Sequence, residues 1–382
     1  GDSDGGWNLI ASPLAESISA DDVTNLIGGQ LPSGQYDYDL YRFNQSASLE
    51  WENYHQHNTT ANPFVLENGK GYLYANKENV TLEFNGAVYP AASKEVTLDY
   101  DANATLAGWN LVGNPFNAPA ILDKSYYKMN PEGTGLVAEA VSSNIAIDAF
   151  TGVMVQANGE DETVRFTKSN AKGQQGTGFG TLQIALTQAG TRGNALLDNA
   201  IVSFNEGDQL GKFYFGTQDA NLYIPQNNKE YAIAYAGNQT EMPLNFKAHK
   251  NGEYTLTVSE TFHSPLSTLH LIDNLTGADI DLLETPSYTF NAHTLDYASR
   301  FKLVFNANGA EDNDDFAFID ADGNIVINGD GFVQIIDMLG HVLATRDVHS
   351  DSRFLSSDFS IGLYVLRLID GEKVKTQKIV IQ

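Results

Sequence analysis

The chain contains no cysteine, few basic residues and no long apolar run, and each absence excludes a class of protein. Without cysteine there is no disulfide, no thiolate nucleophile and no cysteine-ligated metal. No stretch of about 18 apolar residues occurs, so we expect no transmembrane segment. The 22 basic residues stand against 48 acidic ones, and the net charge of −26 repels phosphate backbones. We therefore expect no nucleic-acid partner.

Alternating apolar residues run through nearly the whole chain. Between residues 254 and 258, for example, apolar side chains alternate with threonines, and Asn-Gly pairs such as Asn85-Gly86 recur between such stretches. A period of two is typical of half-buried strands, and Asn and Gly supply the positive φ of tight hairpins. The sequence therefore predicts an all-β, multi-domain protein of antiparallel β-sandwiches, with one helical turn near Ser19–Leu26.

An internal repeat occupies the first 170 residues. The motif GWNLI at residues 6–10 recurs as GWNLV at residues 108–112, and residues 69–84 correspond to residues 150–166. Each copy reads as an opening strand with a tryptophan, a variable middle and a closing hairpin. We place the copies at about 6–92 and 93–170, and expect Trp7 and Trp109 to be core anchors. Because the first copy starts so close to Gly1, we expect the chain to be a fragment of a longer protein.

Two linkers divide the rest of the chain. A glycine- and glutamine-rich linker is expected at 171–180, and an acidic one at 308–315. Between them, residues 181–307 contain eight to ten expected strands, among them KFYFG at 212–216, which suits a two-sheet antiparallel sandwich. After the second linker, residues 316–382 form a terminal module.

The terminal module has the most specific pattern. It contains GFVQIID at residues 331–337 with Gly340 after it, then GLYVLRL at residues 362–368, which includes Gly362 and Tyr364. A last strand carries Lys373, Lys375 and Lys378, which is unusual in so acidic a chain. Lysines on an edge strand discourage edge-to-edge aggregation, and they also offer a docking partner a local positive field.

In order and spacing, these parts resemble the C-terminal sorting domain that Bacteroidetes use for type IX secretion. The resemblance implies an immunoglobulin-like sandwich recognised by the type IX secretion machinery, with Gly340, Gly362, Tyr364, Lys373, Lys375 and Lys378 as its signal residues. It also implies export through the periplasm to the cell surface, cleavage of the domain, and attachment at the outer membrane to lipopolysaccharide. The GWNL-type repeat and the 181–307 sandwich resemble modules found in proteins that carry this domain.

Motifs of catalysis are missing from the sequence. There is no G-x-S-x-G elbow, no H-E-x-x-H and no phosphate-binding glycine loop, so we expect no enzyme activity, no catalytic residue, no cofactor and no metal. On a strand, His55 and His57 would share one face as metal ligands, but their polar neighbours favour a loop. Asp320, Asp322 and Asn324 lack the later ligands of a calcium loop, which favours an acidic turn.

The best candidate for ligand recognition is the aromatic-rich middle of the first copy. Tyr36, Tyr38, Trp51 and Tyr54 would suit a sugar-binding platform if their rings were exposed, and they would fill a core if they were not. We expect a non-enzymatic cell-surface protein for adhesion or display, with a glycan or host-surface ligand as its partner. The alternatives are the accessory tail of a secreted protease or glycoside hydrolase, and a carbohydrate-binding module.

Overall fold

The computed structural model describes residues 6–169, 180–190, 193–216, 218–260, 266–307, 316–319, 324–327, 330–337, 340–349, 352–355, 358–370 and 373–381. The chain divides into two compact units, Gly1–Asn306 and Ala307–Gln382. The linkers expected at 171–180 and 308–315 fall almost entirely outside the described residues. The fold is all-β, as the alternation predicts, and no helix in the described ranges is both long and apolar enough to cross a membrane.

Residues 6–92, here called module one, form the first part of the larger unit. The elements are β1 (Asn8–Ala11), β2 (Ile18–Ser19), η1 (Ala20–Asp22), β3 (Tyr38–Phe43), β4 (Trp51–Asn53), α1 (Tyr54–His57), β5 (Val65–Leu66) and β6 (Gly71–Asn76). The main sheet has the order β1-β6-β3-β4, and β2 pairs with β5. The expected helical turn near residue 19 is η1, a 3₁₀ turn that the Ser19 side chain caps.

Residues 93–169, here called module two, repeat that topology. The elements are β7 (Ser93–Thr97), β8 (Trp109–Gly113), β9 (Ala120–Leu122), β10 (Tyr126–Met129), β11 (Leu136–Glu139), η2 (Val141–Ser143), β12 (Gly152–Gln156) and β13 (Thr163–Lys168). The main sheet is β8-β12-β10-β11, and β7-β13-β9 form a second sheet. When the GWNL strands β1 and β8 are aligned, β6, β3 and β4 of module one correspond to β12, β10 and β11 of module two. The two main sheets thus have the same strand order, which supports the repeat.

The two modules pack against each other reciprocally. The Ala11 N–H donates to the Phe150 carbonyl at 2.8 Å, and the equivalent Gly113 N–H donates to the Gly69 carbonyl at 2.9 Å. The bridges Ile10↔Thr151 and Val112↔Lys70 are related in the same way. Each contact thus occurs twice with the modules exchanged, as at the interface of a twofold dimer. Modules one and two form an approximate internal dimer.

Small residues allow this close approach. A Cβ on Gly71 would lie 2.7 Å from the Val112 carbonyl oxygen, and one on Gly113 would lie 2.4 Å from the Lys70 carbonyl oxygen. Both distances are shorter than any real carbon–oxygen contact, and backbone atoms cannot move aside cheaply. Glycine at both positions is therefore required by the contact between the modules.

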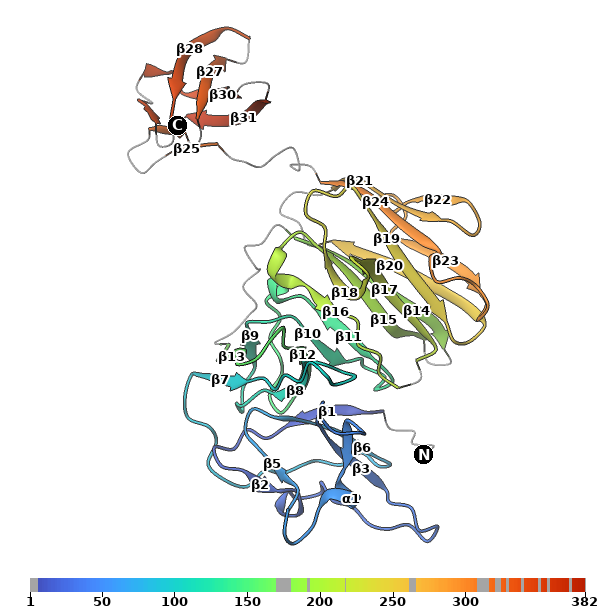
Figure 1. Cartoon of the computed structure of the whole chain (residues 1–382). Coiled ribbons are helices and arrows are strands. Elements are labelled where there is room, and N and C mark those ends of the chain that lie inside the picture. The colour runs from blue at the N-terminus through green and yellow to red at the C-terminus, as the bar shows by residue number, and fades with distance from the viewer. Residues whose placement is uncertain are drawn as a thin grey trace. The chain divides into compact units, whose positions relative to one another are not determined.

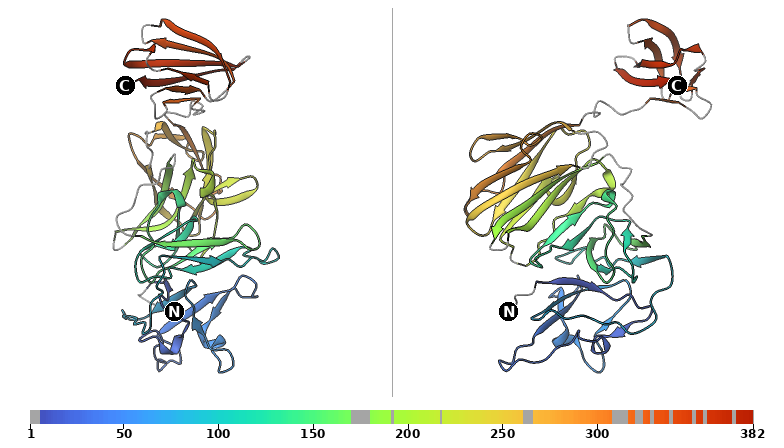
Figure 2. Two further views of the ribbon diagram at one scale, coloured as in Figure 1. Left: turned by 90° about the vertical axis from the view of Figure 1, so that its left-hand side faces the viewer. Right: turned by 180° about the vertical axis from the view of Figure 1, so that it is seen from behind.

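Residues 180–306 complete the larger unit, and module two lies between module one and this part (Figures 1 and 2). The elements are β14 (Thr181–Gly190), β15 (Gly193–Ser203), η3 (Glu206–Asp208), β16 (Leu210–Gly211), β17 (Ala220–Gln226), β18 (Lys229–Tyr235), β19 (Glu241–Ala248), β20 (Gly252–Glu260), β21 (Leu266–Asp273), β22 (Ala278–Asp281), β23 (Ser287–Ala292) and β24 (Phe301–Ala307). They form one 11-stranded sheet, in which β15 pairs with β18 in parallel and the other pairings described are antiparallel.

This sheet folds over on itself, so that a sandwich results. Phe246 on β19 contacts Phe290 on β23, with ring centroids 5.1 Å apart, and Phe290 contacts Phe301 on β24 at 4.9 Å. These rings come from distant positions in the strand order and fill the space between the two layers. The Arg300 guanidinium is sealed beside them and pairs with the fully buried Asp273 at 2.9 Å.

The prediction that KFYFG at residues 212–216 forms a strand is wrong. Residues 212–215 have no strand structure, and Phe213 and Phe215 instead join the core that module two shares with the sandwich. The Phe213 ring packs 4.8 Å from Trp109, while the neighbouring Lys212 turns the other way and forms a buried ion pair with Asp198 at 2.6 Å. One core therefore extends across the boundary between the repeat region and the sandwich.

The smaller unit is a two-sheet antiparallel sandwich with its own core. The strands are β25 (Ala317–Ile319), β26 (Ile325–Ile327), β27 (Gly331–Asp337), β28 (Val342–Val348), β29 (Ser352–Phe354), β30 (Gly362–Asp370) and β31 (Lys373–Ile381). One sheet has the order β25-β26-β29 and the other β28-β27-β30-β31. Buried side chains from both sheets meet between them, among them Ile325, Ile335 and Leu366 at 0% exposure. The unit thus folds around a core of its own residues.

Candidate functional site

Gly340 shapes the turn that links β27 to β28 in the smaller unit. Its φ is +88°, a conformation that favours glycine, and its N–H donates to the Asp337 carbonyl at 3.0 Å. The His341 N–H donates to Asp337 Oδ1 at 2.8 Å, which holds the far side of the turn. Conformation alone therefore accounts for a glycine at this position.

Gly362 and Tyr364 lie at the start of β30. The Tyr364 ring is 6% exposed, and its hydroxyl donates to the Ser360 carbonyl at 2.6 Å. A buried tyrosine that bonds backbone a few residues upstream is the arrangement called a tyrosine corner in immunoglobulin-like domains. A Cβ on Gly362 would lie 3.8 Å from this ring, in ordinary van der Waals contact. Tyr364 therefore contributes to the fold of the unit, whereas the space around Gly362 would also accept a Cβ.

The three signal lysines lie on the terminal strand β31. Lys378 is opposite Val365 of β30 and its side chain is exposed, so it can meet a partner directly. The backbone of Lys373 pairs with Asp370 and that of Lys375 with Leu368, but the side chains of both lysines lie outside the described part of the chain. Of the three lysines, Lys378 is therefore the one whose charged side chain is described, and that side chain is exposed.

The four aromatic residues of module one do not form a single platform. Tyr38 and Tyr54 are 4% and 7% exposed and belong to the core of module one. Trp51 is half-buried on the opposite side, where its ring contacts Phe215 at 6.1 Å. Only Tyr36 is exposed, at 45%. A sugar-binding surface made from all four rings is absent, because three of them are used for packing.

Tyr54 is the centre of a polar network. Its hydroxyl donates to the carboxylate of Asp21, which also accepts from the Asn58 side-chain amide at 3.1 Å. Burial and the Asp21 carboxylate raise the pKa of Tyr54 to about 12. The hydroxyl therefore stays protonated at neutral pH and acts as a donor that fixes α1 to η1.

His55 and His57 lie on α1, so they occupy neither the strand on which they would share a face nor the loop that their polar neighbours favour. Positions two apart on a helix point in different directions, which separates the two imidazoles. The His55 ring instead stacks on Tyr36, with centroids 3.7 Å apart. Among the described residues no group of three or more His, Asp or Glu side chains could hold a metal. Asp320 and Asp322 lie outside the described residues.

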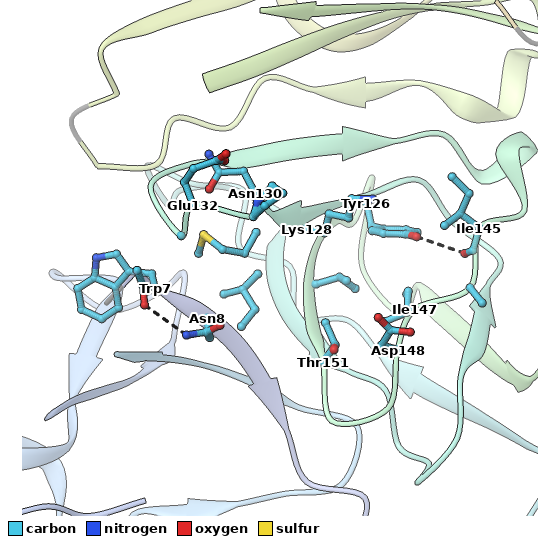
Figure 3. A pocket seen from close by; sticks show the side chains of 17 residues that line it. Trp7, Asn8, Tyr126, Lys128, Asn130, Glu132, Ile145, Ile147, Asp148 and Thr151 are labelled. Atoms are coloured by element: carbon cyan, nitrogen blue, oxygen red, sulfur yellow. Dashed lines mark hydrogen bonds between the residues drawn. The ribbon is translucent and has the colours of Figure 1, made fainter. Parts of the chain in front are cut away.

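A pocket of about 380 Å³ lies where module one meets module two (Figure 3). Trp7 and Asn8 of β1 form one side, and Thr151 and Asp148 of module two lie across from them. The Asn8 side-chain amide donates to the Gly6 carbonyl at 3.2 Å, and Asn8 is otherwise exposed. Lys128 of β10 also lines this pocket, and its amine pairs with Glu139 at 2.5 Å. We call this the first pocket.

A second pocket of about 550 Å³ is lined by the equivalent positions of the other module. Trp109 and Asn110 replace Trp7 and Asn8, Lys70 replaces Thr151, and Arg42 replaces Lys128. Arg42 pairs with Glu52 at 2.6 Å, as Lys128 does with Glu139. Burial raises the pKa of the Glu52 carboxyl, but hydrogen bonds from Arg42 and Asn44 outweigh this and lower it. We call this the second pocket. Sequence reasoning missed both pockets, although the repeated GWN motif marks a wall of each.

Comparison with known proteins identifies only the end of the chain. Residues 314–382 match the model of a family described as the secretion system C-terminal sorting domain. No curated protein matches the chain, and no solved structure matches it. The matched residues fall within the smaller compact unit, Ala307–Gln382, and include all six signal residues.

Proposed function

We infer that the chain is exported by type IX secretion to the cell surface or the surroundings, because residues 314–382 match the family described as the secretion system C-terminal sorting domain. We propose that it acts there as a non-catalytic adhesion or display protein, held at the outer membrane through lipopolysaccharide. The observation that carries the proposal is that the matched residues 314–382 lie in a compact unit of their own. A sorting signal that folds separately can be recognised, and cleaved, while the rest of the chain stays folded.

The architecture of the larger unit supports adhesion or display. Its modules share one continuous core with the sandwich, in which Trp109, Tyr127 and Phe213 pack together. The Tyr127 hydroxyl donates to the Gly211 carbonyl at 3.2 Å, and the Asn199 side-chain amide donates to the Ala138 carbonyl at 2.8 Å. Modules joined by core packing and buried hydrogen bonds form a rigid spacer. Such a spacer suits a protein that presents a surface at a fixed distance.

A reporter fusion tests the export step. Residues 307–382 are attached to the C-terminus of an unrelated periplasmic reporter in a bacterium that has type IX secretion, and the reporter is assayed on the surface and in the medium. We expect export of the fusion, and retention of a control whose tail ends at residue 361 and therefore lacks β30 and β31. Retention of both fusions would count against the proposal. Surface lipopolysaccharide on the exported fusion would support the proposed attachment.

The absence of catalysis is tested separately. The purified chain is incubated with broad panels of peptide and glycan substrates, and we expect no turnover. If a catalytic domain were encoded upstream in the same reading frame, the accessory-tail alternative would replace display as the role of these residues. Sequencing the reading frame upstream of Gly1 decides between the two.

A carbohydrate-binding module is the second candidate, and the exposed Tyr36 ring supports it. This ring is 45% exposed and stacked on His55, so one face is held rigidly while the other is free for a sugar. We expect Tyr36→Ala to abolish any signal on a glycan array. Trp51→Ala should leave that signal unchanged, because Trp51 packs on the opposite side, against Phe215. An array without signal would remove this candidate.

A further inference from the structure

The smaller unit contains a sheet that is apolar on both of its faces. In the sheet β28-β27-β30-β31, one face points into the core, where Val333, Leu366 and Ile379 are at most 7% exposed. Side chains alternate along a strand, so the residues between these belong to the opposite face, here called the outer face. An antiparallel sheet with one face in water normally carries polar residues on that face. The outer face of this sheet departs from that pattern.

A first row of apolar residues crosses the outer face. It is formed by Phe332 of β27, Ile369 of β30 and Val374 of β31, which are consecutive partners in the strand register. Phe332 and Val374 are 36% and 49% exposed, and Ile369 is half-buried. Register partners have Cβ atoms about 4.5–5.5 Å apart, so the three side chains lie side by side. The first row is therefore a continuous apolar stripe over three strands.

A second apolar row lies four residues further along β27. Ile336 pairs with Val342 of β28 and with Val365 of β30. Val342 is 50% exposed, whereas Ile336 and Val365 are half-buried. Val365 in turn pairs with the exposed Lys378 of β31. This signal lysine thus ends the second row and shares its face with the apolar residues.

A polar row separates the two apolar rows. Gln334 of β27 pairs with Thr345 of β28 and Arg367 of β30, and Arg367 pairs with Thr376 of β31. Thr345, Arg367 and Thr376 are exposed. With a rise of about 3.3–3.4 Å per residue, each apolar row lies roughly 7 Å from the polar row. The outer face therefore consists of two apolar stripes with a guanidinium between them.

The charge of the outer face is opposite to that of the chain. Arg367 and Lys378 are its basic residues, and among its register positions the acidic residue is Asp347, opposite Phe332. The chain as a whole has a net charge of −26. Aligned apolar residues rimmed by polar groups are typical of an interaction surface, and a positive field favours a partner with carboxylates.

The chemistry of the face also selects the kind of partner. A lipid surface would place Gln334, Thr345 and Thr376 against acyl chains, where their polar groups would lack hydrogen-bond partners. A second copy docked face to face would oppose the central Arg367 of each copy, and like charges repel. A protein surface with apolar side chains on either side of a carboxylate avoids both costs.

We propose that the outer face is the docking surface through which a protein component of the secretion system recognises the sorting domain. The two apolar rows would pack against apolar side chains of that component, and Arg367 and Lys378 would pair with its carboxylates. The family match supports this partner, because residues 314–382 match a sorting domain and contain every residue of the face. The inference rests on the proposed export and goes further, because it assigns recognition to one face of a sheet.

The test uses the reporter fused to residues 307–382, in a bacterium that has type IX secretion. The variant Phe332→Thr/Val374→Thr removes apolar surface from the first row and keeps residues suited to strands. We expect its exported fraction to fall about tenfold or more, because anchor residues carry most of the energy of an interface. The control Ile319→Thr/Leu355→Thr removes side chains that are 37% and 57% exposed, on or next to the other sheet. This control should be exported like the native fusion.

A charge variant tests the polar row. Arg367→Glu reverses the central charge and should lower the exported fraction about tenfold or more as well, whereas Arg367→Lys keeps the charge and should be exported nearly as well as the native fusion. Circular dichroism of the purified fusions establishes that each variant is folded. If the apolar variant is unfolded, Arg367→Glu decides.

The outcomes separate this inference from the export on which it rests. No export of the native fusion would overturn both. Export of the native fusion together with undiminished export of the folded variants would overturn the docking face alone. Self-association of the purified tail, or its binding to lipopolysaccharide vesicles, would also overturn it if Phe332→Thr/Val374→Thr abolished that interaction, since the occupant would then be a second copy or a lipid.

Discussion

Replacing Lys212 with methionine should destabilise the larger unit strongly. The Lys212 amine lies 2.6 Å from both carboxylate oxygens of Asp198, and the two side chains are 1% and 0% exposed. Methionine fills much of the same volume but leaves Asp198 as a buried charge with only the backbone N–H groups of Leu222 and Asn199. Removing one partner of a buried ion pair costs about 3–5 kcal/mol.

The assay is urea unfolding followed by tryptophan fluorescence. All three tryptophans lie in the larger unit, so the signal is specific to it. With a denaturant slope of about 3 kcal/mol per M, a loss of about 3–5 kcal/mol lowers the urea midpoint by roughly 1–1.7 M. Because Trp109 packs 4.8 Å from Phe213, next to Lys212, the emission of the folded variant also reports any local loosening.

A double variant separates the ion pair from simple packing. Adding Asp198→Asn to Lys212→Met removes the second charge and keeps an oxygen for the Leu222 N–H, so we expect more than half of the lost stability to return. A midpoint shift below about 0.3 M for Lys212→Met, or a double variant less stable than the single one, would refute the reasoning, because the pair would then be effectively solvated.

Three further outcomes follow from the packing. Gly71→Val should lower the same urea midpoint by about 1 M, because its Cβ would meet the Val112 carbonyl oxygen; an unchanged midpoint would mean that the module interface can open. Burial raises the pKa of the Asp273 carboxyl, but hydrogen bonds from Arg300 outweigh burial and hold this pKa below its usual range. The ionised carboxylate therefore stabilises the fold above about pH 4, and this stability is lost as the pH falls further. Asp273→Asn should therefore be less stable at pH 7 and lose less on acidification, and parallel pH curves would contradict this. Tyr364→Phe should cost about 1 kcal/mol and speed hydrogen exchange in β27 and β30 alone; faster exchange in the larger unit would be unexpected.

Strands with clean alternation could be predicted from the sequence, and strands with mixed signals could not. Residues 254–258 lie in β20 as expected. In β17, Pro225 interrupts the apolar run of a true strand, while KFYFG at 212–216 has the composition of a strand but is used for core packing. Alternating apolar residues predict where a strand forms, but they do not tell which aromatic residues fill a core between domains.

The candidate sites show the same limit. A spacing of two residues predicts that Tyr36 and Tyr38 share one strand face, but Tyr38 lies within β3 and Tyr36 precedes it, so one ring is buried and the other exposed. The sorting signal is recognisable because local turn geometry requires glycine at Gly340 and a backbone hydrogen bond holds Tyr364. The two pockets could not be found from sequence, because each is lined by residues of both modules and forms only where the modules meet in the folded unit.

The export of a truncated chain is the most direct test of the account. The full chain and a chain that lacks residues 312–382 are expressed in a bacterium with type IX secretion, and both are assayed in the periplasm and on the cell surface. We predict that the full chain reaches the surface and that the truncated chain stays folded in the periplasm, because Gly1–Asn306 forms its own compact unit. Appearance of the truncated chain on the surface would contradict the account.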